Sequence, residues 1–462
     1  MKLTLELSKL LNQLTPIFKQ ERSAHRATSL MYASLLCMGR KWVTRILNVQ
    51  GRDQVDWSTN YKLFSRAEWK ARELFLPAMS ETLKHIEGDY IPLAGDETRT
   101  RRGGRKVKRS RWTRDPMSPP FHTNFMKGIR WVQFCVLLPL HHTHDISARG
   151  IPISFEPVDL PPKPARNATE EQKEEYKKEK SKNSMAIKTV KQLKQIRQMY
   201  DQIGAQAKTI VAALDGGFCN RTMFQAVFDR IILVVRARKD ASLCFPANDP
   251  GHPKRVYSQE KFTPEQVRKD ESIPWQKMVV WFGGARREIK YKTLDNILWQ
   301  RVAKRKRLRL IVIAATPYRL SPCMPRYYRQ PAFLIIDKPE LPMDIALQTY
   351  FDRWQIEVNH RDEKQDIRIT DAQVWNDKSV DRLPAFMVAS YSYLLLASLN
   401  AFGPERTNDY LQPAIWQRKT SAKRPSCLDL LAKLREDALH SPDIDNLFDF
   451  DVDTDRILLR AA

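Results

Sequence analysis

Apolar residues recur at helical spacing throughout residues 1–85 of the chain. The first stripe consists of Leu3, Leu5, Leu7, Leu10, Leu11 and Leu14. Residues 28–47 have the pattern of a helix, a turn at Gly39 and a second helix that carries Arg40, Lys41 and Arg45. A DNA-reading helix-turn-helix has this pattern, and so does any pair of packed helices with a basic face. Both interpretations stay open at the level of sequence.

The pattern changes near residue 90, where short apolar runs replace the helical stripes. Runs rich in Val, Ile, Phe and Trp that end at turn residues are typical of buried strands. A Gly283-Gly284 pair predicts a tight turn within this region. The predicted strands are residues 90–96, 129–140, 209–215, 230–236, 275–282, 286–291, 307–314 and 332–336.

Later segments return to helical patterns, at residues 186–204, 343–366 and about 383–402. The most apolar stretch, residues 386–402, is short for a bilayer span and contains several Ser and Tyr residues. We therefore expect a buried helix there. Before the first of these helices, a Pro-rich and then Lys/Glu-rich stretch predicts a solvated, charged insertion.

The charge of the chain narrows the class of partner. Lys and Arg number 78 against 53 Asp and Glu, a net charge of +25, which indicates a polyanion. Without a membrane anchor, nucleic acid is the expected partner and a membrane is not. Two basic segments stand out, with nine basic residues in 99–114 and six in 301–309. Contact with phosphates is favoured over solvated loops for both.

The remaining composition excludes several classes of protein. An apolar fraction of 42% excludes a largely disordered chain. The six cysteines are far apart and form no C-x-x-C pair, which excludes a disulfide scaffold and a zinc ribbon.

Acidic residues end two of the predicted strands, at Asp96 and Asp215. Reactive groups gather at the carboxyl ends of strands in open α/β sheets, although an Asp in this position can also simply cap the next turn. Either role is compatible with the sequence around each residue.

A polar stripe marks the helix predicted over residues 343–366. Tyr350, Arg353, Glu357 and Lys364 fall within about 60° of one helix face, and Arg361 joins them. A carboxylate can bind a hard divalent metal ion, and basic side chains can bind DNA phosphates. An exposed helix with ion pairs, such as Arg353 with Glu357, explains one pair but not the length of the stripe.

The spacing Y-(2)-R-(3)-E-(6)-K in this stripe resembles the signature of DDE transposases from bacterial insertion sequences. The order of two strand-end aspartates, a β-rich segment and a Glu-bearing helix is similar as well. The resemblance implies an α/β fold with a ribonuclease H-like catalytic core, a β-rich insertion between the second Asp and the Glu, and an N-terminal all-helical domain. The expected divisions are a helical DNA-binding domain at 1–85, the first part of the core at 86–237 with a charged helical insertion at 157–205, the β-rich insertion at 238–335, the second part of the core at 336–405, and a C-terminal helical region with an acidic tail at 406–462.

The resemblance also implies roles for single residues. Asp96, Asp215 and Glu357 are the expected catalytic residues and ligands of two Mg²⁺ ions, for which Mn²⁺ could substitute. The residues expected to hold DNA are Tyr350, Arg353, Arg361, Lys364, Arg99, Arg101, Arg102, Arg105, Lys106, Arg305 and Lys306. Aromatic residues expected to stack on a displaced base are Tyr327, Tyr328 and Phe333.

The implied activity is metal-dependent cleavage at transposon ends, followed by transfer of the freed 3′-hydroxyl into target DNA. The expected partners are double-stranded DNA, both as terminal inverted repeats and as target, and a second copy of the chain on that DNA. The expected location is the bacterial cytoplasm, associated with the nucleoid. Two alternatives stay open: a catalytically silent DNA-binding protein derived from a transposase, and a metal-dependent nuclease on the same core.

Overall fold

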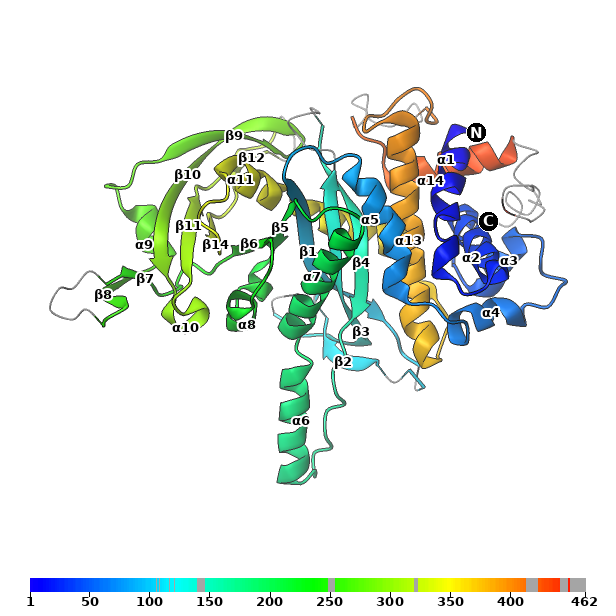
Figure 1. The fold of residues 1–462 in the computed structure, drawn as a ribbon, viewed down its shortest axis with the longest axis horizontal. Helices are drawn as coiled ribbons and strands as arrows, with labels where there is room; N and C mark the ends of the chain where they lie inside the picture. The colour runs from blue at the N-terminus through cyan, green and yellow to red at the C-terminus, as the bar shows by residue number, and fades with distance from the viewer. Residues whose placement is uncertain are drawn as a thin grey trace.

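A computed structural model of the chain shows a mixed α/β fold built around one long, mixed sheet (Figure 1). It describes residues 1–104, 106–107, 109–115, 117–119, 121–138, 146–247, 254–319, 323–412, 423–440 and 448. Within these residues, twelve strands belong to the long sheet and two form a small separate ribbon.

Five neighbouring strands place Asp96 and Asp215. Asp215 directly follows its strand, but the strand of Asp96 continues to Arg101, so the prediction that a strand ends at Asp96 was wrong. In spatial order the five strands are β4 (Arg149–Pro157), β3 (Phe125–Leu138), β1 (Tyr90–Arg101), β5 (Thr209–Leu214) and β6 (Ile231–Arg236). β3 runs antiparallel to both β1 and β4, whereas β1, β5 and β6 are parallel to one another. The short strand β2 (Arg111–Arg114) pairs with β3. This mixed order is consistent with a ribonuclease H-like core.

The central strand β5 is apolar along its length because helices cover both of its faces. Ile210 and Ala212 belong to the same core cluster as Leu193 of α7 (Met185–Gln202). On the other face, Val211 belongs to a cluster with Leu347 of α11 (Met343–Asp352). Strand β5 is therefore buried on both sides, and its end presents Asp215 at a fixed place.

The strands that follow β6 extend the same sheet outward. β14 (Ala332–Ile336) pairs with β6, and β11 (Arg307–Ile313), β10 (Ala285–Leu298), β7 (Leu243–Pro246) and β8 (Tyr257–Phe262) follow in that order. β9 (Gln276–Phe282) forms a hairpin with β10, and the turn contains Gly283 and Gly284, both with positive φ. The smaller elements of this region are α9 (Pro264–Lys269), α10 (Gln300–Ala303), β12 (Pro317–Tyr318) and β13 (Tyr327–Tyr328).

The N-terminal helices gather around one long helix, α13 (Asp377–Phe402), beside α14 (Cys427–Leu439) (Figure 1). They share one hydrophobic core with these C-terminal helices. Their bounds are α1 (Lys2–Asn12), η1 (Thr15–Ile17), α2 (Glu21–Leu36), α3 (Val43–Val49), α4 (Ser58–Ser65), η2 (Ala71–Phe75) and α5 (Leu76–Leu83).

The predicted helix-turn-helix is corrected in one respect. The turn does contain Gly39, with a φ of +70°, but α3 begins only at Val43. Arg40 and Lys41 therefore lie in the connection and not on the second helix. Lys41 is only 2% exposed, and burial lowers its pKa to about 8. Its ammonium group is thus withdrawn from any DNA surface.

Helix α13 is long and apolar enough to cross a membrane by length and composition, but 78% of its most apolar stretch is buried inside the protein. It packs against α1, α2, α4, α5 and β4. The expectation of a buried helix in this segment agrees with that packing, and α13 is the core helix of this half of the molecule.

Helix α6 (Glu170–Lys182) projects from the body of the protein (Figure 1). None of its residues is buried, and a capping box between Thr169 and Gln172 begins it. Pairs such as Lys177 with Glu174, 2.7 Å apart, line its surface. This helix is the charged part of the segment that the Lys/Glu pattern predicted to be solvated. The remaining short helices are η3 (Gly216–Phe218), α8 (Arg221–Gln225) and η4 (Ile369–Asp371).

The helix predicted over 343–366 is interrupted. α11 ends at Asp352 and α12 (Trp354–Gln365) begins after a single turn residue, Arg353. The backbone N–H of Ile356 donates to the Arg353 carbonyl, three residues back instead of four, at 3.1 Å. This tighter turn divides the polar stripe, so the prediction of one continuous helix was wrong at this residue.

Candidate active site

Asp96 and Asp215 lie next to each other on neighbouring strands. In the parallel pairing of β1 with β5, Gly95 stands opposite Leu214, so the next residue of each chain segment is an aspartate. Adjacent strands are about 4.8 Å apart, which brings the two carboxylates together. Gly95 has no space for a side chain, because a Cβ there would lie 2.5 Å from Phe134. Close packing beside the acids thus requires glycine.

Arg353 connects the first acid to the third. Its Nη1 lies 3.7 Å from Asp96 Oδ2, and its Nη2 donates to Glu357 Oε1 at 3.3 Å. Within the described residues, Nε and Nη1 are buried and make no hydrogen bond. The guanidinium therefore balances two carboxylates while keeping N–H groups for a further oxygen acceptor.

The electrostatics of the three acids show that they share one environment. Burial raises the pKa of Asp96 to about 6, against the opposing effects of the Glu97 backbone N–H and the Arg353 charge. The charges of Asp215 and Glu357 contribute to this raised pKa of Asp96, less than burial does. Burial also raises the pKa of Glu357, and Arg353 again opposes the shift. The cluster thus carries more negative charge than its surroundings readily accommodate.

The donor set has the chemistry of divalent-cation ligands but not the arrangement of a metal site. Within the described part of the chain, no group of three or more Asp, Glu, His or Cys side chains could hold a metal ion as placed. The three carboxylates nevertheless offer the oxygen ligands that Mg²⁺ prefers, and a cation among them would relieve the repulsion that raises the pKa of Asp96. Arg353 supplies the positive charge between Asp96 and Glu357.

Tyr350 and Lys364 flank the same acids. Burial raises the pKa of Tyr350, and the Asp215 charge adds to that shift. Burial lowers the pKa of Lys364, while Asp96 is among the charges that oppose the shift. Both side chains are therefore within electrostatic reach of the acids. Arg361 is instead more exposed and pairs with Asp362 at 2.9 Å, in a neighbouring cavity.

The basic residues of segment 99–114 differ in their exposure and in their partners. Arg101 is exposed and pairs with Asp115 at 3.0 Å. Arg99 is mostly buried and lies 3.4 Å from Glu97. Lys106 is exposed, with its Nζ 5.4 Å from the centre of the Trp375 ring. Arg105 lies outside the described residues.

Arg102 differs from its neighbours, and its expected contact with DNA is corrected. Its side chain is buried, with guanidinium N–H groups that donate to the backbone carbonyls of Ala372 and Ile369. Burial lowers the pKa of Arg102 to about 10. The guanidinium therefore holds the segment around η4 to the end of β1 and does not face solvent.

We expect Arg102→Gln to change the stability of the protein and Arg101→Gln to change its binding of DNA. The Arg102 variant should lower the free energy of unfolding by about 2–3 kcal/mol, because buried carbonyl groups lose a charged donor. The Arg101 variant should leave the stability within about 0.5 kcal/mol but weaken DNA binding and reduce its salt dependence by about one unit of slope. Denaturant unfolding and salt-dependent anisotropy measure the two effects. Equal stability of the two variants would contradict the assignment of Arg102.

Arg305 and Lys306 lie away from the acids. They precede β11, whose Arg309 pairs with Ile336 at the end of β14. Because β14 runs antiparallel to β6, the start of β11 lies at the amino end of β6, whereas Asp215 follows the carboxyl end of β5. Lys306 also binds the buried Asp337 at 2.8 Å. These two cations therefore lie at the opposite end of the strands from the acids, and their contact with DNA stays a prediction.

The three aromatic residues that are candidates for stacking on a base differ in their exposure. Tyr327 and Tyr328 form the short strand β13 and are exposed. Phe333 is only 6% exposed and lies in the core of β14, so it cannot stack on a DNA base. The strand pattern of residues 332–336 is the signal that Phe333 belongs to the core.

Two exposed aromatic residues near the far end of β1 were not predicted from the sequence. Trp112 in β2 and Phe125 at the start of β3 are both exposed, on the hairpin next to β1. Their signal in the sequence is the position of Trp112 between Arg111 and Arg114, where an apolar ring interrupts a basic run.

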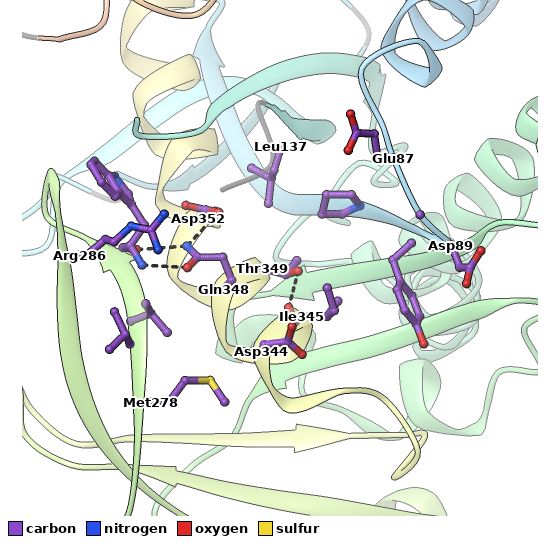
Figure 2. A pocket seen from close by; sticks show the side chains of 16 residues that line it. Glu87, Asp89, Leu137, Met278, Arg286, Asp344, Ile345, Gln348, Thr349 and Asp352 are labelled. Carbon is purple, nitrogen blue, oxygen red and sulfur yellow. Dashed lines mark hydrogen bonds between the residues drawn. The ribbon is translucent and has the colours of Figure 1, made fainter. Parts of the chain in front are cut away.

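Gln348 holds β9 against α11, the helix that precedes Glu357 (Figure 2). Its side-chain amide accepts from the Trp281 backbone N–H at 2.8 Å and donates to the Trp281 carbonyl at 3.1 Å. The same amide donates to Asp352 at 3.1 Å. β9 is thereby fixed to α11, immediately before Arg353.

The cavity in Figure 2, about 430 Å³ in volume, lies beside Gln348 at the amino end of β1. Glu87, Asp89, Asp344 and Asp352 are among its lining residues, together with Arg286. Four carboxylates around one arginine repel phosphate, so this cavity is unsuited to the DNA backbone.

The fold and the paired carboxylates define an α/β protein with an acidic cluster suited to phosphodiester chemistry. The chain matches the family model described as DDE superfamily endonuclease over residues 9–309. It therefore belongs to the DDE superfamily endonuclease family, which implies a DNA substrate and nuclease- or transposase-type chemistry. The matched range contains Asp96 and Asp215 and ends before Glu357. The chain matches no curated protein in sequence.

Proposed function

We propose that this chain is a DNA transposase that cleaves transposon ends and joins the freed 3′-hydroxyl to target DNA. The observation that supports the proposal most is the position of the three acids. Asp96 and Asp215 follow paired positions of parallel strands, and Arg353 binds Glu357 and lies beside Asp96. Together with membership of the DDE family, this arrangement favours cleavage of DNA at these carboxylates.

In this proposal, Asp96, Asp215 and Glu357 would hold two Mg²⁺ ions. Bound there, the ions would lower the pKa of a water molecule and would stabilise the charge of the leaving oxygen. Arg353, Tyr350 and Lys364 bind the phosphates on both sides of the cleaved bond and keep it in line for attack. Arg353 is suited to this role because its buried Nε and Nη1 retain donor capacity.

The two proposed reactions are displacements of the same type at different phosphodiesters. In the first, a water oxygen forms a bond to phosphorus and the 3′-oxygen of the transposon strand leaves as a hydroxyl. In the second, that 3′-oxygen forms a bond to a phosphorus of the target strand, whose own 3′-oxygen leaves. One set of carboxylates serves both because each reaction is an in-line displacement at a phosphodiester.

The test uses purified chain, Mg²⁺ and DNA that carries the inverted repeats flanking its reading frame. We expect nicking at the repeat ends, followed by products in which the ends are covalently joined to a target plasmid. Nicking without joined products would favour a nuclease on the same core. DNA binding without nicking would favour the silent DNA-binding alternative.

We further propose that two copies of the chain act on paired ends, because two ends must be joined to one target. Light scattering of the chain with end DNA is expected to give a complex of two chains and two DNA ends. A complex of one chain per end at all protein concentrations would contradict this part of the proposal.

A further inference from the structure

A cavity of about 520 Å³ lies between α12, the start of β4 and the segment that leads into α14. Gln355 and Arg361 line it from α12, Arg149 from β4, and Lys423 and Arg424 from the segment before α14. These residues come from three distant parts of the sequence, so the site exists only in the folded chain.

The cavity is strongly cationic. Four of its lining residues are basic, namely Arg149, Arg361, Lys423 and Arg424. One lining residue, Asp362, is acidic. Its carboxylate already accepts from Arg361 at 2.9 Å and from the Tyr391 hydroxyl at 3.0 Å. The remaining positive charge is therefore not balanced by the carboxylate in the lining.

Two of these guanidinium groups are fixed by the protein. Arg424 donates to Gln355 Oε1 at 2.9 Å and to the Ala148 carbonyl. Arg149 donates to the Pro425 carbonyl. Burial, and after it the neighbouring charge of Arg149, lowers the pKa of Arg424 to about 9. Like charges held together in this way favour a bound anion.

The cavity shares part of its lining with a second cavity. A neighbouring cavity of about 380 Å³ contains Tyr350 and Arg353. Arg353 and Arg361 are eight helical residues apart, or about 12 Å, a span of three to four phosphates along one strand of duplex DNA. The residues that line both cavities are Ser147, Trp281, Gly284, Gln355 and Val358.

We infer that this cationic cavity is a second DNA-backbone site, which binds a phosphodiester of the strand that passes Tyr350 and Arg353. The inference rests on the proposed function, since it extends the path of the same DNA. Fixed guanidinium groups suit phosphate oxygens because they offer planar, paired donors. The site adds contact with the backbone alone, and so increases affinity without reading sequence.

The experiment measures binding of a fluorescent DNA duplex to the full chain over a range of salt concentrations. Lys423→Gln and Arg361→Gln remove exposed cations from the cavity, and each is expected to lower affinity several-fold and the salt slope by about one. The double variant should lower the slope by about two. Lys261→Gln is the matched control, because Lys261 is exposed on β8, the last strand of the sheet, and should change neither value.

The outcomes separate this inference from the proposed function. If the wild-type chain does not bind DNA, the proposed function fails. If the wild-type chain binds and cleaves DNA but the cavity variants keep its affinity and slope, only the second site fails. An equal loss in Lys261→Gln would also overturn the site, since it would show a general effect of charge. Unchanged thermal unfolding of the variants establishes that they are folded.

A titration with inorganic phosphate distinguishes DNA from a free anion as the occupant. For a DNA-backbone site, millimolar phosphate should shift the melting temperature of the wild-type chain and of Lys423→Gln equally. A larger, saturable shift in the wild-type chain alone would overturn the inference and assign the cavity to free phosphate.

Discussion

Glu357→Gln is expected to reduce DNA cleavage by at least about 1,000-fold, while DNA binding and stability change little. Glutamine keeps the size of the side chain but removes a negative oxygen from the proposed metal site, and metal assistance contributes several kcal/mol to such reactions. Glu357 is half-buried, and Arg353 is its partner in the described structure. The rate of nicking in Mg²⁺, measured with saturating protein, is the relevant quantity.

The matched control is Glu288→Gln. Glu288 lies on β10 and pairs with Lys277 on the neighbouring strand β9, 3.1 Å away. Its loss should leave nicking unchanged, whereas Asp96→Asn and Asp215→Asn should resemble Glu357→Gln. Cleavage by Glu357→Gln at the wild-type rate would show that the Y-R-E-K stripe is not catalytic in this chain.

Stabilisation by Mg²⁺ is expected to weaken strongly as the pH falls from 7.5 to 5. The pKa of Asp96 in the metal-free chain is about 6, and Mg²⁺ binds the deprotonated carboxylate. About one-tenth of this group is ionised at pH 5, so the apparent affinity should fall about tenfold. At 100 times the dissociation constant measured at pH 7.5, Mg²⁺ adds about 2.7 kcal/mol to the free energy of unfolding, and at pH 5 about half of that.

The metal-free chain should show the opposite trend with pH. A carboxyl whose pKa is raised on folding binds its proton more tightly in the folded state, so stability falls as pH rises from about 4 to 6. Asp381 also has a pKa of about 6, but its contribution cancels when curves with and without Mg²⁺ are subtracted. Denaturant unfolding at each pH measures both trends, and Asp96→Asn serves as the control. A Mg²⁺ effect of the same size at pH 5 and 7.5 would exclude Asp96 as a ligand.

Local patterns in the sequence were sufficient to predict most of the elements near the candidate site. β5 and β14 lie where apolar runs predicted them, because strands buried on both faces must be apolar along their length. The helical stripe of Tyr350 and Glu357 was also predictable, since residues three and four apart share a helix face. The same pattern could not show the tight turn at Arg353.

Local sequence patterns did not predict which basic residues are exposed. Arg101 and Arg102 are neighbours in one basic run, yet one faces solvent and the other binds the carbonyls of Ala372 and Ile369. The carbonyl groups that bury Arg102 come from a segment 267 to 270 residues further along the chain. Charge density along a sequence therefore predicts a nucleic-acid partner but not which cations contact it.

The sequence by itself determined the two aspartates beside apolar runs, the polar stripe and the excess of positive charge, because each depends on residues close together in the chain. The tertiary structure decided which of these residues come together in space. The parallel register of β1 and β5 placed Asp96 beside Asp215, and the order of the sheet moved Lys306 to the opposite end of the strands. The cavity of Arg149, Arg361 and Arg424 likewise arises only from long-range contacts, since no local pattern records which distant segments meet.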